Sequence, residues 1–142
     1  MKPATVLKTY AELEVGERAC ITKTISMQVV KNFAEITGDY NPLHLDPEYA
    51  KDTRFGKPIA HGMICAGLLS AVVGTKLPGE AIYMAHNLIF KRPLYVGDTV
   101  TAWVEIKEKV NDAKKIFKTR AWVEDSEGKV LVDGEGTYMA VA

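Results

Sequence analysis

Two residues that can transfer protons lie close together in the sequence. Asp39 and His44 are five positions apart in the run Gly-Asp-Tyr-Asn-Pro-Leu-His. On one continuous helix their side chains would point about 140° apart, given 3.6 residues per turn. Pro42 interrupts a helix here and restricts Asn41 to extended conformations, so we expect a stiffened bend on which the two side chains converge. A carboxylate can then act as a general base beside an imidazole, a group that ionises near neutral pH.

Each of these residues also has an ordinary structural interpretation. An aspartate in a Gly-Asp-x-Asn-Pro run can serve the turn alone, and a single histidine often only packs. The set Asp39, His44, Asp46 and His61 could suggest a metal site. Their spacing matches no helical pattern of metal ligands, so we predict no metal.

Capping residues predict the helices on either side of this bend. Ser26 fits the N-cap of an amphipathic helix over 26–37, and Gly38 stands where that helix would stop. Asp46, followed directly by a proline, predicts a second short helix over 48–52. The two helices therefore flank the bend.

The stretch 61–76 is predicted to form a helix, roughly 24 Å long at 1.5 Å per residue. A helix that is hydrophobic all round is a buried helix, and here the apolar side chains do not keep to one stripe. They are Met63, Ile64, Leu68, Leu69, Val72 and Val73.

Strand patterns account for most of the remaining chain. In one of them, Ile82, Met84, Leu88 and Phe90 are expected to share one face of a strand. In the strand 99–110, Val100, Ala102, Val104 and Ile106 alternate with Thr101, Trp103, Glu105 and Lys107. Long strands joined by short turns form antiparallel hairpins, and a strongly curved sheet can wrap a buried helix. We therefore predict an α+β fold in a single domain over 1–142. The predicted strands are 18–25, 81–90, 99–110, 115–124 and 130–141.

Composition excludes several classes of protein. Of the 142 residues, 47% are hydrophobic and 25% are charged, and the formal net charge is zero, so no basic surface suggests nucleic acid. The stretch 58–75 has no charged residue but contains proline and glycine, which makes it a poor membrane span. The polar N-terminus is not a signal peptide, so a cytoplasmic protein is expected. Cys20 and Cys65 are expected to be buried free thiols, and they offer no zinc site.

These motifs together resemble one family, the MaoC-like hydratases of the hot-dog fold, and specifically the (R)-specific enoyl-CoA hydratases. The resemblance covers the chain from Val15 onward in order and spacing. It implies a curved antiparallel sheet around one central helix that begins near Gly62. It also implies a homodimer, or a dimer of dimers, in which the acyl chains bind along the subunit interface. The residues that carry it are Gly38-Asp39-x-Asn41-Pro42-Leu43-His44-x-Asp46, Ala50, Phe55, Pro58-Ile59-Ala60-His61-Gly62-Met63 and Phe90-Lys91-Arg92-Pro93-x-x-x-Gly97-Asp98.

The resemblance implies reversible hydration of trans-2-enoyl-CoA to (R)-3-hydroxyacyl-CoA. Asp39 would be the general base for a water, and His44 would hold the same water and help to move its proton. Negative charge on the thioester oxygen needs donors, and the first N–H groups of a helix lack internal partners. The Gly62 N–H is the natural choice, and such a fixed donor is worth roughly 3 kcal/mol. This chemistry requires no cofactor.

Five further residues are expected to support the site. Asn41 braces the turn, and His61 is a structural neighbour of Gly62. Ser70 is expected, by resemblance alone, to hydrogen-bond near the catalytic pair. Lys91 and Arg92 either meet the coenzyme A phosphates or form an ordinary solvated strand end, and the sequence does not separate these alternatives.

Two other functions stay open at this stage. The same residues would serve a (3R)-hydroxyacyl-carrier-protein dehydratase of fatty-acid synthesis. A non-catalytic partner subunit of a heteromeric dehydratase is less well supported, because such a partner is expected to lack Asp39 or His44. The length of the acyl chain is also open, with Ser70, Val73 and Tyr83 as candidates for the end of the pocket.

Overall fold

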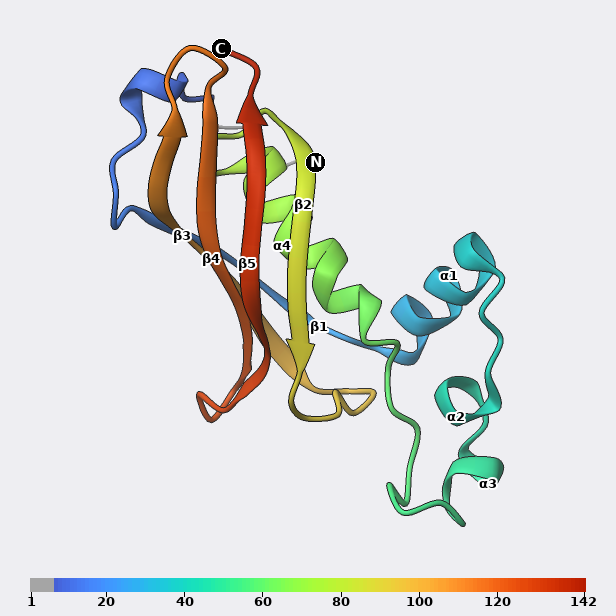
Figure 1. The fold of residues 1–142 in the computed structure, drawn as a ribbon. Coiled ribbons are helices and arrows are strands. Elements are labelled where there is room, and N and C mark those ends of the chain that lie inside the picture. Colours follow the sequence, from blue (N-terminus) through green and yellow to red (C-terminus); the bar gives the residue numbers. More distant parts are fainter. Residues whose placement is uncertain (1–6) are drawn as a thin grey trace.

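The structure is a computed structural model that describes residues 7–142, and its largest element is one antiparallel sheet. The sheet has five strands in the order β1-β3-β4-β5-β2. Figure 1 shows α4 along one face of this sheet, while α1, α2 and α3 stand to one side of it. The elements are η1 (Tyr10–Glu12), β1 (Arg18–Thr24), α1 (Met27–Thr37), α2 (Pro42–Leu45), α3 (Pro47–Ala50), α4 (Met63–Thr75), β2 (Ala81–Phe90), β3 (Thr99–Asn111), β4 (Ile116–Asp125) and β5 (Val130–Ala140).

The predicted caps are confirmed. The Ser26 side chain accepts a hydrogen bond from the Val29 N–H at the start of α1. That helix ends at Gly38, whose φ of 79° is left-handed, a conformation that glycine adopts without strain. The Asp46 side chain likewise caps α3 by accepting from the Glu48 N–H.

The bend differs from its prediction in one respect. Pro42 does not only interrupt a helix but begins α2, with the Asn41 side chain as its N-cap. Proline suits this position because the first helical N–H needs no intrahelical acceptor. The short helix α3 also begins and ends earlier than the predicted 48–52.

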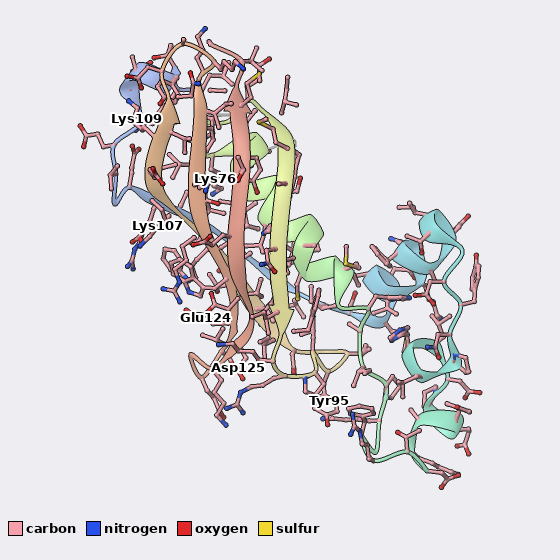
Figure 2. All side chains as sticks on the ribbon, in the orientation of Figure 1. Lys76, Tyr95, Lys107, Lys109, Glu124 and Asp125 are labelled. Carbon is pink, nitrogen blue, oxygen red and sulfur yellow. The ribbon has the colours of Figure 1, made fainter. Side chains whose placement is uncertain are left out.

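The core lies between α4 and the inner face of the sheet. On β3 the predicted alternation is confirmed, because Val100, Ala102, Val104 and Ile106 are fully buried. Polar and charged side chains lie on the outer face, where Figure 2 labels Lys107 and Glu124. The helix contributes Ile64, Cys65, Leu69, Val72 and Val73 to the core.

The prediction that α4 is buried on every side is wrong for this chain. Met63 is 58% exposed, and Gly67 and Ser70 on the same side of the helix are exposed too. The reason is that five strands form an open sheet, which covers one side of the helix and ends at β2. Cys65 is buried as predicted, whereas Cys20 is only half-buried.

The predicted face of β2 is also wrong, because the strand contains a bulge. Tyr83 pairs with Tyr138 of β5, but the next pair joins Ala85 to Thr137, so Met84 is an extra residue. An extra residue moves every later side chain to the other face. Leu88 therefore shares the inner face with Tyr83, whereas the sequence analysis grouped it with Ile82 and Met84.

Among the described residues, no helix is long and apolar enough to cross a membrane.

Candidate active site

The bend between α1 and α2 holds the Asp39 carboxylate at the surface. The Asn41 N–H donates to Asp39 Oδ1 at 3.3 Å, and the Leu43 N–H donates to Asn41 Oδ1 at 3.0 Å. Two successive side-chain-to-backbone bonds make this bend stiff. The Asp39 side chain is 51% exposed, so a substrate or a water can reach it.

The His44 ring is oriented by a backbone carbonyl. Its Nδ1 lies 2.6 Å from the Ile59 oxygen. A carbonyl only accepts, so Nδ1 carries the hydrogen and Nε2 of the neutral ring is left as an acceptor. Ile59 is itself held by an antiparallel bridge to Tyr95, which Figure 2 labels.

His61 contacts both Asp39 and His44 from the protein interior. Its side chain is 3% exposed, and Nε2 donates to the Asp39 carbonyl at 2.9 Å. Its ring also lies against the His44 ring, with the centroids 4.0 Å apart, and against Phe33 at 4.7 Å. Through these contacts the buried His61 ring supports both Asp39 and His44.

The structure brings Asp39 and His44 together. One carboxylate oxygen of Asp39 and one nitrogen each of His44 and His61 lie within 4.8 Å of one another. One water can bridge polar atoms at such a separation. The arrangement can therefore hold a water between a carboxylate and an imidazole nitrogen that accepts, which is the geometry of general base catalysis.

The same three residues are the metal candidate of the described part of the chain. A metal ion would need ligand atoms at about 2.0–2.2 Å from one centre. His61 Nε2, however, already donates to the Asp39 carbonyl, and its distance to Asp39 Oδ2 is 4.0 Å. These residues fit a bridging water better than a metal, and the absence of a metal stays a prediction.

Gly62 stands at the N-terminus of α4. Within residues 7–142 its N–H has no hydrogen-bond acceptor. The glycine permits a close approach, since an added Cβ would lie 3.0 Å from two carbons of the Phe90 ring. The helix start therefore presents a free donor beside an aromatic side chain.

A cavity of about 350 Å³ joins His44 and Gly62. Its wall carries three cations, Arg54, Lys91 and Arg92. Lys91 is paired with Asp133 at 3.6 Å. Burial raises the pKa of the Cys65 thiol in this wall to about 11, so the thiol stays protonated. The sequence analysis missed Arg54, although a cation shortly after the Asp–His motif was a visible signal.

A second groove, of about 620 Å³, runs along α4 and β2. Phe90 lines both this groove and the first cavity. Ser70 and Tyr83 line the groove and not the cavity that holds His44. The structure thus separates Ser70 from the cavity that contains His44, although the sequence analysis expected it near the catalytic pair.

Comparisons with known proteins agree with this fold. The sequence profile of the family described as MaoC like domain matches residues 11–128. The (R)-specific enoyl-CoA hydratase of Rhodospirillum rubrum is 42% identical over 96% of this chain and 94% of its own length. A 3-hydroxybutyryl-CoA dehydratase of Methylorubrum extorquens is also 42% identical, over 95% of this chain and 85% of its own.

A solved structure gives the same result in three dimensions. The unliganded R-hydratase from Pseudomonas aeruginosa superposes with a TM-score of 0.88 at 41% identity, covering 93% of this chain and 84% of that one. The fold expected from the resemblance, a hot-dog fold, is therefore confirmed, with the sheet left open in this chain. By sequence along almost its whole length and by the course of its backbone, the chain belongs to the MaoC-like family.

Proposed function

We propose that this protein catalyses the reversible hydration of trans-2-enoyl-CoA to (R)-3-hydroxyacyl-CoA. The observation that carries the proposal is the approach of Asp39 and His44 within 4.8 Å, next to the free N–H of Gly62. The relatives named as an enoyl-CoA hydratase and a 3-hydroxybutyryl-CoA dehydratase support it, because these names describe the two directions of one reaction.

In this reaction, a bound water donates one hydrogen to Asp39 and the other to Nε2 of His44. The water oxygen bonds to C3 as Asp39 takes its proton, and the electrons of the double bond move towards the thioester oxygen. The Gly62 N–H stabilises the charge on that oxygen. The proton then passes to C2, so that one water has been added. Each positioned acid–base group raises the reaction rate by about 100- to 10,000-fold.

Cations in the cavity wall support a coenzyme A substrate. Arg54, Lys91 and Arg92 line the cavity that also contains His44. A guanidinium binds phosphate with two parallel hydrogen bonds, so the two arginines are the better phosphate ligands. Lys91 contributes less, because Asp133 already neutralises it at 3.6 Å.

The direct test follows the loss of enoyl-thioester ultraviolet absorbance with crotonyl-CoA and octenoyl-CoA, with no cofactor added. Chiral analysis then identifies the product. We expect rapid hydration to the (R) isomer. Folded protein that hydrates neither substrate, or that makes the (S) isomer, overturns the proposal.

The second candidate is a dehydratase that acts on acyl-carrier-protein thioesters. The observation in its favour is the same group of cations, since an acidic carrier protein would be attracted to a basic cavity mouth. The test measures kcat/KM for the same enoyl group carried by coenzyme A and by the carrier protein, at equal concentrations. A higher kcat/KM with the carrier protein would favour the second candidate, and a higher value with coenzyme A would favour the first.

We further propose that residues 1–142 act as one domain that pairs with a second copy through β2. This edge strand exposes a row of large apolar side chains, and such edges and patches are typical of interfaces. Light scattering should give twice the mass of one chain, and a mass of one chain would contradict the pairing. The apolar residues are Ile82, Met84, Ile89 and Phe90, which are 48–60% exposed.

A further inference from the structure

Three strands bring polar side chains to one point on the inner face of the sheet. Gly136 of β5 pairs with Thr119 of β4 on one side and with His86 of β2 on the other. Tyr138 lies two positions further along β5 and therefore points to the same face. This polar row, made of Thr119, His86 and Tyr138 around Gly136, faces α4.

The missing side chain of Gly136 leaves space for the Tyr138 ring. An added Cβ would lie 2.6 Å from Cε2 and 2.9 Å from the hydroxyl of Tyr138, and 3.1 Å from Oγ1 of Thr119. The tyrosine ring thus lies over the glycine, with its hydroxyl on the side of Thr119. Glycine is needed here because of this close approach.

The polar row lacks hydrogen bonds of its own. Within residues 7–142, neither ring nitrogen of His86, nor Oγ1 of Thr119, nor the hydroxyl of Tyr138 has a partner. Thr119 is 0% and Tyr138 is 1% exposed. A buried polar group without a partner is destabilising, and proteins rarely leave one. Four such atoms in one place indicate that something else provides their partners.

Tyr83 lies where the polar row meets the groove along α4 and β2. Its ring lies 4.7 Å from the ring of Tyr138 and 5.2 Å from that of His86. Tyr83 is 40% exposed, so its ring has room to rotate. Both Tyr83 and His86 line the groove, and a rotation of Tyr83 would open the polar row to an occupant of it.

The groove leads back to the proposed reaction site. Phe90, which lies against Gly62, is shared by the groove and the cavity. At the other end, Ser70 lies eight residues beyond Gly62 on the helix, which is roughly 12 Å at 1.5 Å per residue. An acyl chain whose thioester contacts Gly62 would therefore reach the polar row with its distal end.

The chemistry of the polar row selects a neutral partner. The groove is lined by apolar side chains, glycine, Ser70, Tyr83 and His86, and no charged side chain of residues 7–142 lines it. Desolvation lowers the pKa of His86 and raises that of Tyr138, so both groups stay uncharged at neutral pH. An uncharged imidazole accepts at one nitrogen and donates at the other, and the two hydroxyls do both.

We infer that the polar row is a subsite for a neutral hydroxyl group on the distal part of the acyl chain. The hydroxyl donates to the free nitrogen of His86 and accepts from Tyr138 or Thr119, while Tyr83 rotates to admit it. The inference depends on the proposed function for its substrate, a 2-enoyl-CoA.

The test compares plain and ω-hydroxylated substrates of equal length. Hexenoyl-, octenoyl- and decenoyl-CoA and their ω-hydroxy forms are assayed for kcat/KM. We expect the hydroxylated form to be preferred at one length. In Tyr138→Phe and Thr119→Val, which keep the shape of the side chains, the ratio of the two kcat/KM values should fall about tenfold. Thr22→Val, on the distant strand β1, should leave the ratio unchanged.

A binding measurement separates this inference from the hydratase proposal. Calorimetry with decanoyl-CoA and ω-hydroxydecanoyl-CoA, and with the shorter pairs, needs no turnover. Tighter binding of a hydroxylated ligand, lost in Tyr138→Phe, supports the subsite even if no hydration occurs. Equal or weaker binding of the hydroxylated ligand at every length overturns the subsite, even if the plain substrates are hydrated normally. In that case the polar row only binds water.

Discussion

Replacing Asp39 by asparagine removes the proposed base while keeping its surroundings. The Asn41 N–H donates to Oδ1 at 3.3 Å and His61 donates to the Asp39 carbonyl at 2.9 Å, and both acceptors persist in Asp39→Asn. The side chain is 51% exposed, so the free energy of unfolding should change by less than about 0.5 kcal/mol. A positioned general base contributes about 100- to 10,000-fold, so kcat should fall by that factor.

The matching change at the imidazole is His44→Asn. In the wild-type protein, His44 Nδ1 lies 2.6 Å from the Ile59 oxygen. The amide nitrogen of asparagine can take the place of Nδ1 and donate to the same carbonyl. The change removes the function of Nε2, together with the contact between the His44 and His61 rings. If Asp39 and His44 act on one shared water, their losses will not multiply, and the double variant should be about as slow as the worse single variant.

Initial rates of crotonyl-CoA hydration, with thermal unfolding measured in parallel, decide the matter. Asp52→Asn, at an exposed aspartate beyond α3, is the matched control and should keep the wild-type rate. A folded Asp39→Asn protein with kcat within about tenfold of wild type would refute Asp39 as the base. Losses that multiply in the double variant would refute the shared water.

Four further outcomes are expected. Thr119→Val should raise the free energy of unfolding in urea by about 1 kcal/mol, because it removes a buried hydroxyl that has no partner. Burial lowers the folded-state pKa of His86 below its ordinary 6.5, so the unfolded state binds the proton first as the pH falls. The melting temperature should therefore drop below pH 6.5, and drop less in His86→Gln. Arg54→Ala and Arg92→Ala should raise KM for coenzyme A substrates, less so at high salt. Dialysis against a chelator should leave the hydration rate unchanged, which a rate loss restored by added metal would contradict.

The local features of the site could be predicted from the sequence because their causes are local. The left-handed Gly38, the Asn41 turn and the Asp46 cap each involve residues no more than four positions apart. Residue type and spacing therefore determine them, and with them the bend that carries Asp39. Alternation along β3 is likewise a property of a single strand, and it identified the buried face correctly.

Other features depend on which strands lie side by side, and no pattern within one segment records this. The bulge at Met84 exists only relative to β5, and it decides that His86 and not Ala85 faces the helix. The exposed side of α4 depends on where the sheet ends. The polar row joins Thr119, Gly136 and His86 from three strands through their register, over separations of 17 to 50 positions. The sequence by itself determined the bend that presents Asp39 and His44, because that bend rests on local hydrogen bonds. The tertiary structure alone decided what lines the groove beyond them, because strand register is set by packing across the whole sheet.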